Sequence, residues 1–140
     1  MNHGGPMHKT SNALLTIVLF STIAIAAKKF PMTAATIVPG ARGVVEIDKD
    51  KNGNTRVNVE VQFLAKPESL TPPATVYVVW LQEKDGSAEN QGQLRVDNKL
   101  KASFKTTTPA KSFDLFVTAE RDSAVKTPSG AEVMRAAIQP

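Results

Sequence analysis

The fold is decided by residues 42–64, RGVVEIDKDKNGNTRVNVEVQFL, where two runs of alternating apolar and polar residues flank a short polar segment. From Val57 to Phe63 every second residue is apolar, a period of two that is typical of a strand with one buried face. Asn52 and Gly53 stand between the runs and can both take the positive φ that a type I′ turn requires. The segment therefore predicts a β-hairpin with Phe63 on its buried face.

The rest of the chain shows the same short period and no long helical one. Residues 75–82, TVYVVWLQ, are apolar on both faces, which favours a central strand that is covered on both sides. Further along, Leu100, Ala102 and Phe104 are expected to alternate inward. The remaining strands are expected over residues 91–97, 100–107, 113–119 and 132–138. About seven short strands with Gly, Pro and Asn turns predict an all-β fold, an immunoglobulin-like antiparallel β-sandwich over residues 42–140.

An uncharged apolar run, ALLTIVLFSTIAIAA, occupies residues 13–27. As a helix it would span roughly 22 Å, which is less than the ~30 Å hydrocarbon core of a bilayer. Its polar start and the small-residue site at 24–26 predict a secretory signal peptide over residues 1–26, followed by a linker over residues 27–41. An uncleaved anchor helix is the alternative, because two lysines follow the run at once. In both cases we expect an exported protein, periplasmic or extracellular. It touches a membrane only if the segment is uncleaved, and then only through residues 13–27.

Composition excludes several kinds of chemistry. The chain of 140 residues has no cysteine, and its two histidines, His3 and His8, both precede the apolar run. A thiol nucleophile, a disulfide framework, a Cys/His zinc site and a histidine base in the main domain are therefore excluded. The formal charge of +4 is a mild excess, and aromatic residues make up only 6% of the chain, so no stacking platform for nucleic acid is apparent. We expect neither a cofactor nor a nucleic-acid partner.

The polar segment of the hairpin contains the beginning of a calcium loop, D-x-D-x-N-G. Asp48, Asp50 and Asn52 supply oxygen ligands at positions 1, 3 and 5, and a glycine follows at position 6. Position 12 should be a bidentate glutamate, but it is Val59, which belongs to the strongest alternating run. We therefore expect a polar hairpin tip, and keep a calcium site at these three residues as the alternative.

Two carboxylates raise the question of an enzyme. Asp114 and Glu120 alternate onto one face of one predicted strand, and a hydrolase using such a pair is the rival enzyme hypothesis. Carboxylates on one strand are commonplace, however, so we expect no enzyme. Glu120 is expected to be a partly shielded carboxylate at the strand end, paired with Arg95, Arg121 or Arg135.

Two further features have a structural and a functional interpretation. Trp80 and Tyr77 fall on opposite faces of their strand, and Trp80 is expected to pack between the sheets, with a ligand-binding surface as the alternative. Lys99, Lys101 and Lys105 share one face of a predicted strand. They are expected to protect an exposed sheet edge, although such a stripe can also bind an anionic ligand.

Short motifs follow one another downstream of residue 75: YVVWL at 77–81, GQL at 92–94, FDLFVTAE at 113–120 and TPSG at 127–130. In order and spacing they resemble the extracytoplasmic domain of anti-sigma-K factors, where a Y-x-x-W strand, a G-x-L strand and a V-T-x-E…P-x-G ending recur. The resemblance implies a β-sandwich outside the membrane. Anti-sigma factors of this kind also carry a cytoplasmic helical region, which the twelve residues before the apolar run are too few to form. The resemblance therefore implies the outer domain and not the regulation of a sigma factor.

Together these observations predict a non-enzymatic, exported or envelope-associated β-sandwich interaction module. Its partner is expected to be an envelope protein or another copy of the same chain. The alternative is an extracellular module that binds calcium or a small ligand, centred on the polar tip of the hairpin.

Overall fold

The computed structural model describes residues 4–5, 13–21 and 27–139 of the chain. This part is all-β: eight antiparallel strands form a nearly closed sheet, and the 3₁₀ turn Pro67–Ser69 is its one helical element. Residues 13–21 have no regular secondary structure, and residues 22–26 lie outside the described part, so the expected signal or anchor helix is not seen. Among the described residues no helix is long and apolar enough to cross a membrane.

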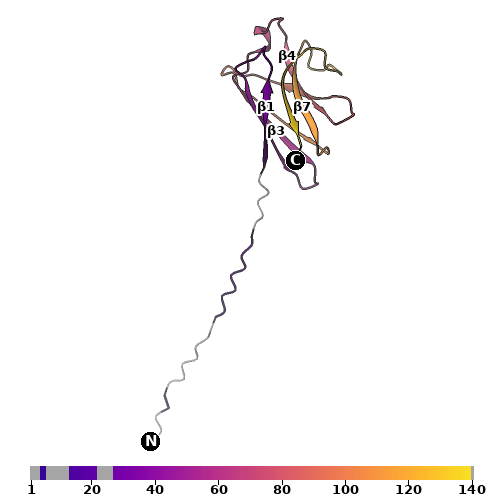
Figure 1. Ribbon diagram of the computed structural model, residues 1–140. Coiled ribbons are helices and arrows are strands. Elements are labelled where there is room, and N and C mark those ends of the chain that lie inside the picture. Colours follow the sequence, from indigo (N-terminus) through magenta and orange to yellow (C-terminus); the bar gives the residue numbers. More distant parts are fainter. Residues whose placement is uncertain (1–3, 6–12, 22–26, 140) are drawn as a thin grey trace.

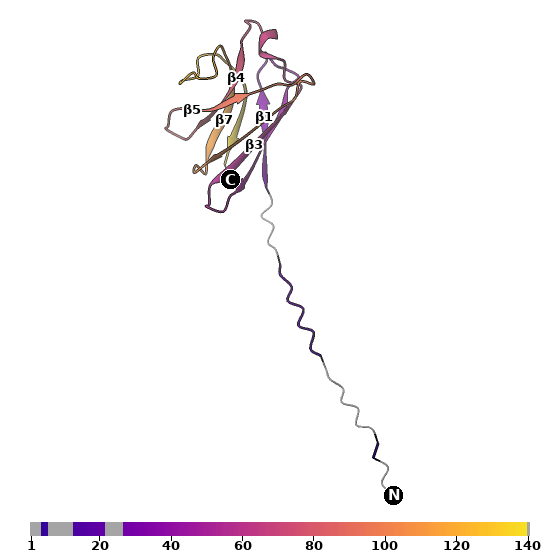
Figure 2. The same cartoon turned by 180° about the vertical axis from the view of Figure 1, so that it is seen from behind.

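The strands follow one another in the order β5-β4-β7-β8-β1-β2-β3-β6 across the sheet. Figure 1 shows β1 and β3 on one side of the domain and β4 and β7 on the other, and Figure 2 adds β5 beside β4. We call these two sides the β2–β3 layer and the β4–β7 layer. The bounds of the eight strands are β1 (Lys28–Ala34), β2 (Arg42–Lys49), β3 (Thr55–Gln62), β4 (Val76–Gln82), β5 (Glu89–Leu94), β6 (Ala102–Thr108), β7 (Phe113–Glu120) and β8 (Ala131–Ile138).

Strand β1 joins the two layers. Its residues 28–32 pair with β2, whereas residues 33–34 pair with β8. The segment expected to be a linker or entry segment thus contributes a strand, which begins at Lys28. On the opposite side, β5 and β6 come together through a hydrogen bond of 3.0 Å from Thr106 Oγ1 to Gln91 Oε1.

The strands run along one direction of the domain, so its turns and loops gather at two opposite ends, which we call the near end and the far end. At the near end β1 begins and β8 finishes, and the turn at residues 50–54 lies beside them. The far end is the opposite one, where β3, β5 and β7 finish and β6 begins. The loops at residues 63–75, 95–101 and 121–130 belong to this far end.

The hairpin predicted over residues 42–64 is confirmed as β2 and β3, which pair from Arg42 with Gln62 to Lys49 with Thr55. Its turn is not type I′, however, because within the hairpin turn only Gly53 has a positive φ, 78°. The Gly53 N–H donates to the carbonyl of Asp50 over 3.2 Å, which is the pattern of a turn closed by one left-handed residue.

The main core lies between the layers and is built from alternate residues of both. Val45, Val57 and Val59 from one layer and Tyr77 and Leu115 from the other are fully or almost fully buried in it. Such pairing of two apolar faces removes both from water, which is the main stabilising effect in a domain of this size.

Trp80 is buried, but the expected place between the layers is wrong. Strand alternation gives that place to Tyr77, and Trp80 lies on the outer face of the β4–β7 layer with Val78 and Phe116. The Trp80 and Phe116 rings stack with centroids 6.4 Å apart. Val125, from the loop at residues 121–130, packs against this small second core.

Candidate interaction surface

Two bulky apolar residues, Phe63 and Leu100, are exposed at the far end. Each lies two positions beyond Val61 and Ala102, the last pair between β3 and β6. The Leu64 N–H donates to the Leu100 carbonyl over 3.1 Å, which holds the two loops together at this point. Phe63 is 58% exposed and Leu100 is 38% exposed.

Both residues have a left-handed backbone, with φ of 56° at Phe63 and 59° at Leu100. For a residue with a side chain this conformation is less favourable than the right-handed one by about 1–2 kcal/mol. It is rare for bulky residues and tends to mark a turn or a functional site. The same conformation ends the strand alternation, so neither side chain follows its neighbours into the core.

The loop that carries Leu100 is held by a carboxylate. Asp97 Oδ1 accepts the backbone N–H groups of Lys99 and Lys101 over 2.8 and 2.9 Å. These donors hold the pKa of Asp97 below its usual value, with Lys101 the stronger of the two. Lys66 Nζ donates to Asn98 Oδ1 over 2.9 Å and so ties this loop to the one that carries Phe63. Both apolar side chains therefore stand on loops that are held in place, which lowers the entropy lost on binding.

Basic residues share the two loops that carry this apolar pair. Lys66, Arg95, Lys99 and Lys101 are exposed there, and the same loops hold two carboxylates, Glu68 and Asp97. A shallow groove of about 320 Å³ runs beside them, and its lining includes Lys66, Glu68 and Arg95. We call Phe63, Leu100, the four basic residues and the carboxylates of Glu68 and Asp97 the far-end patch. Its formal charge, four positive and two negative groups, is +2.

The sequence interpretation missed the far-end patch because it placed Phe63 and Leu100 on buried strand faces. It also expected one strand over residues 91–97, whereas β5 ends at Leu94 and the loop begins there. A useful signal was present in Asp97, because a short carboxylate that accepts nearby backbone N–H groups is typical of a loop. Of the expected lysine stripe, Lys105 alone lies in β6, an edge strand.

The calcium candidates have other partners in the hairpin. Asp48 accepts two hydrogen bonds from Arg56, of 2.7 Å from Nε and 2.6 Å from one terminal nitrogen, and this pairing lowers the pKa of Asp48. Asp50 Oδ1 accepts the backbone N–H groups of Asn52 and Asn54. Val59, at the glutamate position, is buried in the core. The described residues contain no group of three or more His, Cys, Asp or Glu side chains that could hold a metal ion.

Glu120 is almost completely buried, and its carboxylate closes a loop. Oε1 accepts the backbone N–H groups of Ser129 and Gly130 over 2.7 and 2.8 Å, and the Thr118 hydroxyl over 3.2 Å. Oε2 accepts the Ser129 hydroxyl over 2.9 Å. Thr118 Oγ1 in turn accepts the indole N–H of Trp80 over 2.8 Å. One connected network thus links the second core to the loop that covers it.

Burial alone would raise the pKa of Glu120. The N–H groups of Gly130 and Ser129, with the Ser129 and Thr118 hydroxyls, together outweigh burial and hold the pKa below its ordinary value. The predicted pairing with Arg95, Arg121 or Arg135 is wrong: within the part of the chain that the structure describes, no arginine forms an ion pair with Glu120.

This network should make the domain sensitive to acid. Since the folded-state pKa of Glu120 lies below its ordinary value of 4.5, its stabilisation is present above pH 4.5 and is lost as the pH falls through the folded value. We expect Glu120→Gln to melt below the parent protein at pH 7, and the gap between the two melting temperatures to narrow towards pH 3. A difference in melting temperature that stays constant from pH 7 to pH 3 would contradict the role given to the charged Glu120 carboxylate.

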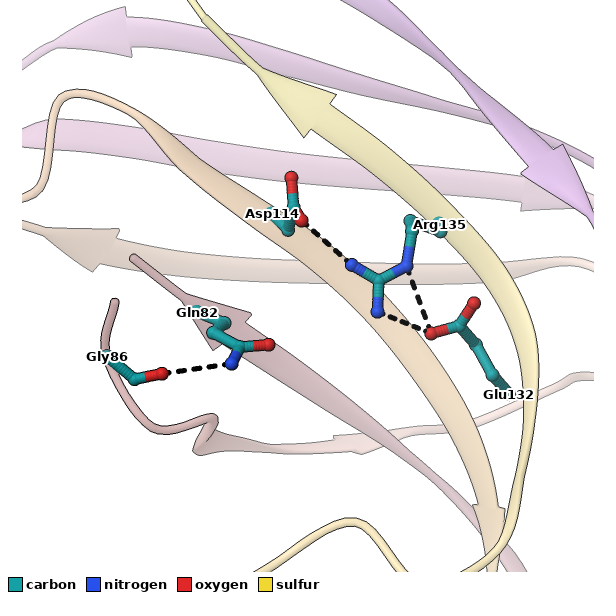
Figure 3. Close-up of polar contacts among 5 residues, drawn as sticks. All are labelled: Gln82, Gly86, Asp114, Glu132 and Arg135. Atoms are coloured by element: carbon teal, nitrogen blue, oxygen red, sulfur yellow. Dashed lines mark hydrogen bonds and ion pairs between the residues drawn. The ribbon is translucent and has the colours of Figure 1, made fainter. Parts of the chain in front are cut away.

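Asp114 and Glu120 do not form a carboxylate pair. They lie at opposite ends of β7, six residues apart, which is about 20 Å along a strand. Asp114 instead pairs with Arg135 over 2.9 Å, and Arg135 also pairs with Glu132 over 2.6 Å, as Figure 3 shows. The Arg135 guanidinium stands 4.4 Å from the centre of the Phe116 ring. The Arg135 side chain and its two carboxylate partners thus cover the Phe116 side of the second core.

Comparison with known proteins adds no assignment. No protein-family model matches the chain, and no curated protein matches it.

Proposed function

We propose that this chain is an exported, non-enzymatic β-sandwich module that binds an envelope protein through the far-end patch. The observation that carries the proposal is the exposed pair Phe63 and Leu100, each on a left-handed backbone. The backbone conformation and the exposure of apolar surface both disfavour the folded state. Features that oppose stability in this way are typical of binding sites.

The charges of the far-end patch favour an acidic partner. An apolar centre with a polar or charged rim is the usual arrangement of a protein–protein interface. A second copy of this chain is the less favourable partner, because a symmetric contact would bring Lys66, Lys99 and Lys101 against the same lysines. We therefore propose a partner surface with carboxylates around an apolar socket.

The proposal also assigns a location and a fold family. We propose that residues 1–26 are the export signal, with an anchor helix over residues 13–27 as the uncleaved form, and that the domain is an immunoglobulin-like sandwich. Two facing antiparallel layers around one core support the sandwich. The resemblance of the sequence motifs to the outer domain of anti-sigma-K factors is part of this proposal. In this chain the T-x-E and P-x-G residues supply Thr118, Glu120 and Gly130, which form one hydrogen-bonded network.

A photo-crosslinking amino acid at position 63 tests the proposal. p-Benzoylphenylalanine there keeps an aromatic side chain and, on illumination of cells that contain the protein, should form one discrete adduct with an envelope protein. Leu100→Asn in the same chain should abolish the adduct. The same amino acid at Asn52, exposed at the near end, is the control and should not form it.

The mass of the adduct separates the possible outcomes. An adduct of twice the chain mass would mean self-association and would contradict the proposed envelope partner. Equal adducts from positions 63 and 52, or none from position 63, would overturn the far-end patch as the binding surface.

A further inference from the structure

The near end of the domain carries exposed lysines from three separate segments. Two lie at the start of β1, one at the end of β2, one in the hairpin turn that follows and one in the loop before β7. The Nζ atom of the last of them donates to the Gly53 carbonyl, which ties that loop to the turn. We call this group the basic end; its members are Lys28, Lys29, Lys49, Lys51 and Lys111. Within residues 27–139 no lysine of the basic end forms an ion pair.

The acidic residues nearby leave an excess of positive charge. Asp48 is paired with Arg56, Asp50 caps the turn, and Glu46 lies beside Lys29 in the β1–β2 register. Five lysines and Arg56 against these three carboxylates give +3 on this side of the near end. The other layer differs, because its β4–β5 loop carries Glu83 and Asp85 with Lys84, and β5 begins with Glu89. The positive charge is thus confined to the side on which β1 enters.

The chain leaves little distance between this basic end and the apolar run. β1 begins at Lys28, directly after the run over residues 13–27, and so no linker separates the two. Wherever that run meets a bilayer, the basic end lies at the level of the headgroups. Lysine side chains are long enough to reach headgroup phosphates, and positive charge near an anionic leaflet is attractive.

We propose that the basic end binds the anionic headgroups of a lipid bilayer. This inference goes beyond the proposed function, because it concerns the opposite end of the domain and does not involve Phe63 or Leu100. Bound in this way, the domain directs the far-end patch away from the membrane. In the uncleaved form, where the apolar run is the anchor, an acidic protein or a nucleic acid fits less well, since neither accounts for the run beside the lysines.

Vesicle co-sedimentation tests the proposal with residues 27–140, which contain every residue of both cores. The domain should bind vesicles of 30% phosphatidylglycerol in phosphatidylcholine and should not bind pure phosphatidylcholine. Binding should weaken steeply when the salt concentration is raised from 50 to 500 mM. Changing Lys49, Lys51 and Lys111 together to Gln should lower the partition coefficient roughly 100-fold.

A matched control variant distinguishes binding by a local site from binding that depends only on the net charge of the domain. Arg42→Gln, Arg121→Gln and Lys126→Gln together remove the same charge from exposed positions at the far end. This variant should lower the partition coefficient by no more than about threefold if the site, and not the net charge, decides binding. An equal loss in both triple variants would overturn the proposal, as would equal binding to neutral vesicles.

Two additional measurements identify what the domain binds on the vesicles and which surface binds it. Inorganic phosphate at constant ionic strength should not displace the domain; full displacement would mean that it binds free phosphate instead of a surface. Phe63→Asn should leave vesicle binding unchanged. Failure of the cross-linking experiment with intact vesicle binding, or the reverse, therefore rejects one proposal without the other.

Discussion

We expect Trp80→Ala to lower the free energy of unfolding by about 3–5 kcal/mol, one of the two largest effects of any single substitution considered for this domain. Trp80 is fully buried, stacks on Phe116 and donates its indole N–H to Thr118. Alanine would leave a large cavity under the loop at residues 121–130 and remove the N–H group that Thr118 Oγ1 accepts. Urea unfolding followed by circular dichroism measures the loss, since Trp80 is the only tryptophan and the variant lacks its fluorescence.

Trp80→Phe is the control for this prediction. It keeps an aromatic ring against Phe116 but loses volume and the indole hydrogen bond, so we expect a smaller loss of about 1–2 kcal/mol. The parent protein should show blue-shifted tryptophan fluorescence that iodide quenches weakly. A loss below 1 kcal/mol for Trp80→Ala would mean that the second core contributes little to stability.

The second large effect is expected at Gly130. A Cβ atom at this position would lie 1.6 Å from the Ala119 carbonyl oxygen and 3.1 Å from Glu120 Oε2. The backbone would have to move away, which breaks the N–H bonds from Gly130 to the buried carboxylate. We expect Gly130→Ala to destabilise the domain by roughly 3 kcal/mol or more, because a buried charge loses part of its hydrogen bonding.

Gly40→Ala is the matched control for Gly130. A Cβ atom at Gly40 meets nothing within 4 Å, and we expect its melting temperature to stay within a few degrees of the parent. Thermal unfolding by circular dichroism compares the two variants directly. Similar melting temperatures for both would contradict the role given to the Glu120 network.

Sequence patterns predicted the regular part of this fold well. The alternation from Val57 to Val61 and the two-faced apolar run at 75–82 became β3 and β4, because side-chain period and burial follow directly from strand geometry. The all-β class followed from the same period. The turn at Gly53 was placed correctly, although its type depended on hydrogen bonds that the Asp50 carboxylate accepts from the backbone, which periodicity does not report.

The candidate sites were harder to predict for a physical reason. Phe63 and Leu100 continue an apolar pattern, and only their backbone conformation, set by contacts between two loops, turns them outward. Glu120 looks like an ordinary strand-end carboxylate until the loop at residues 121–130 folds back and presents N–H groups to it. Both features depend on residues that are distant in sequence, and a single sequence without its fold does not bring them together.

The central claim is that Phe63 is held at the surface for binding and not for stability. The thermal unfolding of Phe63→Asn tests this most directly, because asparagine tolerates the left-handed backbone and removes the apolar side chain. Relief of backbone strain and loss of partial burial are each worth about 1 kcal/mol, so they nearly cancel. We predict a melting temperature within about 3 °C of the parent protein. A fall of about 8 °C or more would show that Phe63 supports the fold, and would contradict the claim.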